Sequence, residues 1–273
     1  MDILLFVAIA PAAFLLYQVY KNDPVEKEPT GLLVKLLIFG AISVIPAIVL
    51  EIIGSNVILE HWRGSYWTYL ATENYLVIAL VEEACKFVFL ILFTWKNKAF
   101  DYVFDGIVYA VFVSLGFAIA ENVMYVFQYG LGTALLRAVT AIPGHCIFAV
   151  FMGYFYGQAK YADIKGMGSG KIGNLLAALV VAVALHGTYD FLASVDSWQF
   201  VLLFYAFLIA MMIAGYKMVK KQSKEAKRLH DDPSDGLGIG TSEGETMGFG
   251  DMPNTSGDLF GKDNNNGFGS FGG

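Results

Sequence analysis

Two adjacent carboxylates and an ammonium lie in the middle of an apolar stretch. Glu82, Glu83 and Lys86 interrupt the run over residues 74–94, which is long enough to cross a bilayer, since a span needs about 20 apolar residues. Each charge at the bilayer centre costs roughly 2.5–3.5 kcal/mol on insertion scales. On a helix Lys86 can reach either carboxylate, because it follows them by four and three residues. Such a pair could supply a general base, and a structural ion pair is the alternative.

Further polar residues recur in three later apolar stretches. They are Glu121 with Asn122, His145 after Pro143-Gly144, and His186 with Asp190 one helical turn on. An imidazole can stabilise an oxyanion, protonate a leaving amine or bind a metal, and a carboxylate one turn away can hold its tautomer. An asparagine could hydrogen-bond an unwound substrate strand. Each of these residues taken alone is equally consistent with a structural hydrogen bond.

Composition excludes an ordinary soluble domain. The 273 residues are 56% hydrophobic and 15% charged, with a mean hydropathy of +0.57, which is typical of a polytopic membrane protein. The two cysteines, Cys85 and Cys146, both fall in apolar stretches, so no disulfide framework is expected.

The apolar stretches predict an all-α membrane protein with about seven transmembrane helices. We expect them near residues 3–20, 31–53, 74–94, 104–128, 141–159, 172–193 and 198–219. Lysines concentrate in the loops after the first, third and fifth spans and after the seventh. The positive-inside rule therefore places the N-terminus outside, the C-terminus in the cytoplasm and the protein in the cell membrane.

Charge and composition separate a tail from the helices. The net charge is −6, and residues 231–273 hold eight acidic residues against Lys262, so the remainder is about neutral at +1. We draw no nucleic-acid partner from this charge. Residues 1–220 are expected to form the helical domain, with the polar motifs in 74–195, and the Gly/Asp/Asn-rich segment 221–273 is expected to be a disordered cytoplasmic tail.

The polar residues are expected to lie at one depth. Counted from the predicted cytoplasmic helix ends, Glu82, Glu121, His145 and His186 are about 13 to 17 residues in, or roughly 20–26 Å. Independent structural ion pairs need not agree in depth. Stripes of small residues at four-residue spacing on the same helices, which include Gly106, Gly153 and Gly157, favour close helix packing around such a site.

The motifs together resemble those of the PrsW family of intramembrane proteases, which is related to the CAAX prenyl protease superfamily. They are Glu82-Glu83-x-x-Lys86, Phe104-Asp105-Gly106 leading to Phe117-x-x-x-Glu121-Asn122, Pro143-Gly144-His145, and His186-Gly187-x-x-Asp190. The resemblance covers roughly residues 75–195. It implies hydrolysis of a peptide bond in a single-span membrane protein, such as an anti-sigma factor, near the extracytoplasmic face of the bilayer.

The resemblance and the residue chemistry give an expected site. One of Glu82 and Glu83 would activate water, with Glu82 favoured by the resemblance. His145 and His186 would stabilise the oxyanion or protonate the leaving amine, with Glu121 also in the site. Lys86, Asn122 and Asp190 would support these groups.

A zinc ion is the cofactor that these residue types would bind, although the sequence has no HExxH motif and a metal-free mechanism stays open. Its ligands would come from Glu82, Glu83, Glu121, His145 and His186. Two other function classes fit intramembrane charges, an ion- or proton-coupled transporter and a non-catalytic scaffold that holds partner helices.

Overall fold

The computed structural model describes residues 3–23, 27–225 and 228–229, and all regular elements in these ranges are helical. Residues Met1–Asp231 form one compact unit. The last helix continues to Glu225, which is beyond the boundary expected at residue 220. The rest of the expected tail, apart from 228–229, lies outside the described residues.

The helices follow the apolar stretches closely. In order they are α1 (Ile3–Lys21), α2 (Thr30–Ile42), α3 (Val44–Gly54), η1 (Ser55–Leu59), α4 (Tyr66–Thr72), η2 (Glu73–Ala79), α5 (Leu80–Thr94), α6 (Asp105–Tyr129), α7 (Leu131–Val139), α8 (Ala141–Ile164), α9 (Gly168–Ser194) and α10 (Trp198–Glu225). The elements η1 and η2 are π-helical.

Five helical stretches among the described residues are long and apolar enough to cross a membrane. They are Thr30–Leu59, Asp105–Tyr129, Leu131–Ile164, Gly168–Ser194 and Trp198–Glu225. The first expected span is a shorter apolar helix, Leu5–Lys21, and the third, within 66–94, carries four charged residues. The all-helical membrane architecture is therefore confirmed, while the count of seven spans and the orientation stay predictions.

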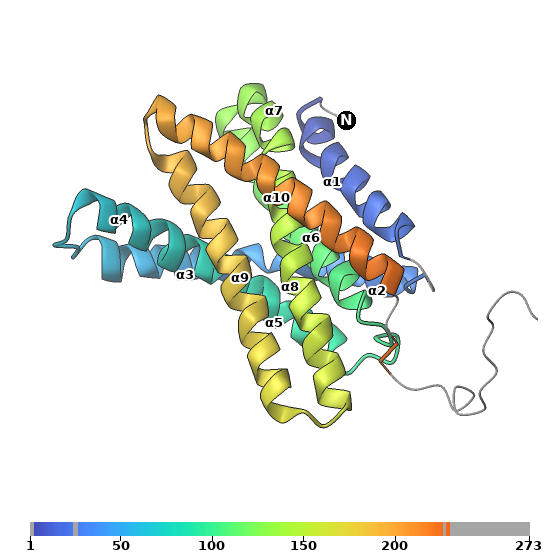
Figure 1. The fold of residues 1–273 in the computed structure, drawn as a ribbon. Coiled ribbons are helices and arrows are strands. Elements are labelled where there is room, and N and C mark those ends of the chain that lie inside the picture. The colour runs from blue at the N-terminus through green and yellow to red at the C-terminus, as the bar shows by residue number, and fades with distance from the viewer. Residues whose placement is uncertain (1–2, 24–26, 226–227, 230–273) are drawn as a thin grey trace, which may run out of the picture. The chain divides into compact units, whose positions relative to one another are not determined.

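Helix α6 lies at the centre of the bundle and packs against α1, α2, α5 and α8, while α8 also packs against α9 (Figure 1). Glycines permit the closest approaches. A Cβ atom on Gly153 of α8 would lie 2.4 Å from the carbonyl oxygen of Gly106 on α6, and one on Gly116 would lie 2.1 Å from the carbonyl oxygen of Leu37 on α2. Small residues thus bring α6 into backbone contact with two neighbours.

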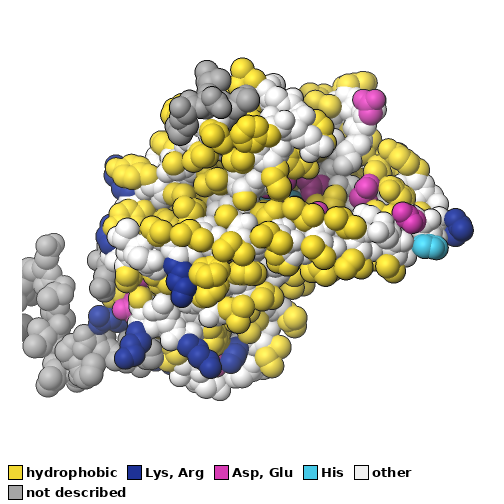
Figure 2. Space-filling view, turned by 180° about the vertical axis from the view of Figure 1, so that it is seen from behind, with side chains coloured by type: hydrophobic (Ala, Val, Ile, Leu, Met, Phe, Trp, Pro, Cys, Tyr) yellow, Lys and Arg dark blue, Asp and Glu magenta, His cyan; other side chains and the backbone are white. Residues whose placement is uncertain are grey.

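The segment 54–73, between the second and third expected spans, is mostly helical. It contains η1 and α4, and the Ser65 hydroxyl accepts a hydrogen bond from the Thr68 amide at the start of α4. With α3 and η2 these elements form a hairpin that projects from the bundle (Figure 1). Figure 2 shows this projection covered largely by apolar side chains, with acidic, His and Lys or Arg groups toward its tip, while most Lys and Arg side chains of that face lie toward the opposite end.

Candidate active site

The acidic pair of α5 surrounds a buried ammonium. Lys86 Nζ donates to Glu82 Oε2 at 3.0 Å and to Glu83 Oε1 at 2.7 Å, and its side chain is 1% exposed. The ammonium also lies 4.1 Å from the centre of the Phe117 ring. The predicted pairing is therefore present with both carboxylates at once, as helical spacing of three and four residues permits.

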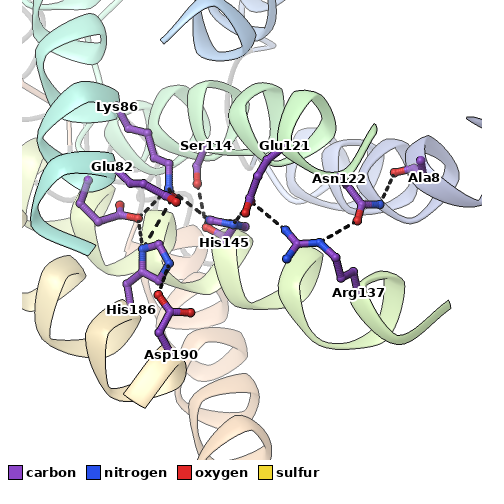
Figure 3. Close-up of polar contacts among 11 residues, drawn as sticks. Ala8, Glu82, Lys86, Ser114, Glu121, Asn122, Arg137, His145, His186 and Asp190 are labelled. Carbon is purple, nitrogen blue, oxygen red and sulfur yellow. Dashed lines mark hydrogen bonds and ion pairs between the residues drawn. The ribbon is translucent and has the colours of Figure 1, made fainter. Parts of the chain in front are cut away.

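His145 joins this group from the first turns of α8. Its Nδ1 lies 3.2 Å from Lys86 Nζ, and its Nε2 lies 3.0 Å from Glu121 Oε2 on α6. Because an ammonium only donates hydrogen bonds, Nδ1 must be the acceptor, and Nε2 then carries the proton that it donates to Glu121. These contacts fix both the ring orientation and its tautomer (Figure 3).

His186 of α9 completes the cluster in a similar way. Its Nδ1 lies 2.9 Å from Glu83 Oε1 and its Nε2 lies 3.2 Å from Asp190 Oδ2. Glu83 Oε1 accepts a hydrogen bond from Nδ1, whereas the contact between Nε2 and Asp190 Oδ2 is an ion pair, because that oxygen is buried without a hydrogen-bond partner in the described chain. The imidazole also stacks on Phe148, with ring centres 4.9 Å apart. In both histidines, Nδ1 therefore faces a residue of α5. Nε2 faces a different carboxylate in each case, Glu121 for His145 and Asp190 for His186.

Arg137 of α7 extends this network. Its Nη2 lies 2.9 Å from Glu121 Oε2, and its Nε donates to Asn122 Oδ1 at 3.0 Å. Asn122 in turn donates to the Ala8 carbonyl of α1 and is fully buried. The amide of Asn122 is therefore engaged on both sides and faces away from the cluster, so it anchors Arg137 instead of reaching a substrate strand.

A cavity of about 500 Å³ opens beside the cluster. Its walls come from α3, η2, α5, α6, α7, α8 and α9. Among the predicted site residues, those that line it are Glu82, Glu121, His145, His186 and Asp190. Glu83 and Lys86 lie behind Glu82 and are not part of the lining. The volume is large enough for several water molecules, and Glu82 is the member of the acidic pair that borders it.

The donor set also suits a divalent metal ion. One ligand atom from each of Glu82, Glu83, His145 and His186 lies within 4.8 Å of the others. The Glu83 Oε2 atom is buried without a hydrogen-bond partner among the described residues, so it is available to bind a ligand. Histidine ligands that donate their second ring nitrogen to a carboxylate are typical of zinc sites. Glu121 belongs to this outer carboxylate layer, whereas the sequence offered it as a direct ligand.

Comparison with known proteins gives an independent indication. Residues 28–216 match the family described as PrsW family intramembrane metalloprotease. A Protease PrsW of Geobacillus kaustophilus is 30% identical over 82% of this chain and 94% of its own length. A Protease PrsW of Shouchella clausii is 31% identical over 81% of this chain and 97% of its own length. The Protease PrsW of Bacillus subtilis is 30% identical over 78% and 92% of the two chains. No solved structure matches.

Proposed function

Because the chain belongs to the PrsW family of intramembrane metalloproteases, we propose that the cluster around Glu82 is the site at which it hydrolyses peptide bonds. Family membership makes the protein an intramembrane peptidase. The observation that carries the assignment of the site is the cavity itself. It brings Glu82, His145 and His186 from three helices to one space that is large enough for water.

Glu82 is proposed as the general base. Its carboxylate borders the cavity, while Glu83 is held by Lys86 and His186. A water molecule would transfer a proton to Glu82 as its oxygen attacks the scissile carbonyl carbon. Glu82 would then return that proton to the leaving nitrogen as the C–N bond breaks, giving a carboxylic acid and an amine. His186 borders both the cavity and Glu82 and is proposed as the donor to the developing oxyanion, which requires one of its ring nitrogens to leave Glu83 or Asp190.

In a metal-dependent alternative, Glu82 would be a ligand and not the free base, and the metal would be held by Glu82, Glu83, His145 and His186. When bound, such an ion polarises a carbonyl and lowers the pKa of a bound water. Glu121 and Asp190 would orient the two imidazoles through their Nε2 atoms. Lys86 holds the same carboxylates with a positive charge of its own, so the ammonium would have to withdraw from at least one of them as a metal binds.

The proposed substrate is a membrane-anchored protein cut near the extracytoplasmic face, such as an anti-sigma factor. The cavity is lined by the first turns of α8 and the last turns of α9. Lys165 and Lys171 lie at the opposite ends of these two helices. The positive-inside rule supports a cytoplasmic position for the lysines and hence an extracytoplasmic position for the cavity.

Co-expression with single-span anti-sigma factors tests this proposal. We expect the wild-type chain to release a shortened fragment. Glu82→Gln should reduce cleavage at least a hundredfold with normal membrane insertion, because the water loses its base. Glu60→Gln, on the exposed turn after η1, is the matched control and should cut normally. Normal cleavage by Glu82→Gln would refute the site, and ion flux in liposomes without any scission would favour a transporter.

A further inference from the structure

One wall of the cavity has no part in the chemistry proposed above. Helix α3 lines the cavity with residues at i, i+3, i+4 and i+7: Val44, Ala47, Ile48 and Glu51. These positions share one face of a helix. Residues between and beyond them are exposed on the outside of the bundle, namely Leu50, Ile52 and Ile53. The carboxylate of Glu51 is thus directed into the cavity, and the lipid-facing side of the helix is apolar.

Glu51 differs from the other charged groups of the cavity. Each of the others has an ion-pair partner within the described chain: Glu82 with Lys86, Glu121 with Arg137, and Asp190 with His186. Glu51 has no hydrogen bond or ion pair with any described residue. An isolated carboxylate at membrane depth is costly, and such residues are generally functional. A ligand that enters the cavity could supply the missing partner.

The level of Glu51 relative to Glu82 follows from the packing of α3. Ala47 lies in one apolar cluster with Val81 and Cys85, which lie one residue before and three residues after Glu82 in the chain. Glu51 is one turn farther along α3, or about 6 Å at 1.5 Å per residue. An extended strand advances about 3.3 Å per residue. A substrate strand cut beside Glu82 would therefore bring a side chain to Glu51 about two residues from the scissile bond.

The charge balance of the cavity indicates what that side chain should be. The lining contains four carboxylates, Glu51, Glu82, Glu121 and Asp190, and a single guanidinium, that of Arg137. Since ionised carboxylates only accept hydrogen bonds, the complementary group is a donor, and a cationic donor forms the stronger bond. We propose that Glu51 forms a subsite for a lysine or arginine side chain about two residues from the scissile bond. This proposal rests on the proposed proteolytic function of the same cavity.

Binding of synthetic peptides tests the subsite without requiring hydrolysis. The probes are peptides with an apolar segment of about 20 residues in which one lysine, glutamine or glutamate is moved through successive positions. They are titrated into detergent-solubilised protein carrying Glu82→Gln, so that cleavage does not interfere. At one position we expect the lysine peptide to bind about tenfold more tightly than the glutamine peptide, as a charge-assisted hydrogen bond predicts. Adding Glu51→Gln should abolish this difference, and Glu51→Lys should make the glutamate peptide the tighter one.

Two controls separate this inference from its premise. Glu60→Gln, on the same projecting hairpin but outside the cavity lining, should keep the preference for lysine. Equal binding of the lysine and glutamine peptides at every position, or a preference that survives Glu51→Gln, would overturn the subsite. Hydrolysis of the same peptides by the chain with Glu82 intact is measured separately, so failure of the proteolytic function would appear there and not in the binding data.

Discussion

At the scale of single residues, Lys86 is the most consequential side chain of the cluster. Its ammonium lies within 3.2 Å of Glu82, Glu83 and His145, three of the four residues that could hold a metal. Without Lys86, Glu82 would lose its close partner and Glu83 would keep only His186, and a buried charge that loses its partner is strongly destabilising. Lys86 therefore satisfies the same donors that a divalent cation would, and the two positive charges compete for them.

The substitution Lys86→Met tests this competition. Without the ammonium, the affinity for Zn²⁺ should rise at least tenfold, measured by competition with a chromophoric chelator on detergent-solubilised protein. The metal-free variant should have a lower Tm than the wild type, because two buried carboxylates lose their partner, and added Zn²⁺ should restore it. Lys160→Met is the control, since Lys160 donates to the Trp95 carbonyl away from the cluster. An unchanged or weaker zinc affinity for Lys86→Met would contradict the competition.

At the scale of helices, the backbone contact between α6 and α8 holds together the two helices that carry Glu121 and His145. Gly106 and Gly153 face each other at this contact, and a Cβ on either would lie within 2.6 Å of the other's carbonyl oxygen. Since backbone atoms cannot move aside as a flexible side chain can, added volume has to separate the helices. The hydrogen bond from His145 to Glu121 depends on this separation.

The substitution Gly153→Ala should therefore destabilise the protein by about 1–3 kcal/mol, as overpacking typically does. It should also reduce cleavage by more than the loss of folded protein explains. Thermal unfolding in detergent and fragment release from a co-expressed substrate are the two measurements. Gly173→Ala on α9 is the control, because nothing lies within 4 Å of its added Cβ. That variant should be neutral or slightly stabilised, since alanine favours helix by up to about 1 kcal/mol over glycine. Equal behaviour of the two variants would rule out a role for the close contact.

The sequence predicted the positions of the long helices and the convergence of their polar residues better than the direction of individual side chains. Residue counts along an apolar stretch give the depth of a residue in the membrane. These counts predicted a common depth for Glu82, Glu121, His145 and His186. Adjacent residues point about 100° apart on a helix, so counting could not decide whether Glu121 or Asn122 faces the cavity. The partners of Arg137 could not be predicted for the same reason, because they depend on how α7 is rotated against α6.

At the scale of the whole molecule, a second buried polar group lies near the Lys-rich end, before the start of α2. The Glu28 carboxylate is 6% exposed and accepts a hydrogen bond from the Tyr109 hydroxyl at 2.6 Å. Burial raises the pKa of Glu28 from 4.5 to about 7. The folded protein therefore binds a proton more tightly than the unfolded chain, and stability should fall as the pH rises from about 4.5 to 7.

The substitution Glu28→Gln should flatten this pH dependence. Glutamine keeps an acceptor for Tyr109 and cannot ionise, so the loss of stability between pH 5 and pH 8, up to roughly 3 kcal/mol from the size of the shift, should be largely removed. The Tm in detergent, measured at intervals across this range, gives the comparison. Glu60→Gln, whose side chain is exposed, should follow the wild-type curve. Parallel curves for wild type and Glu28→Gln would show that another group carries the dependence.

The orientation of the molecule decides which side of the membrane a substrate must enter from. The cavity is lined by the ends of α8 and α9 that lie away from Lys165 and Lys171, and the rule that places lysines in the cytoplasm predicts that it opens on the other side.

A cysteine at residue 60, on the turn after η1, should react with a membrane-impermeant maleimide in intact cells. A cysteine at residue 165, on the turn after α8, should react only in inverted vesicles. The native Cys85 and Cys146 are buried and should contribute little background. Labelling in the reverse pattern would require the substrate to approach from the cytoplasm and would exclude extracytoplasmic cleavage, and labelling of both positions from one side would contradict the predicted topology.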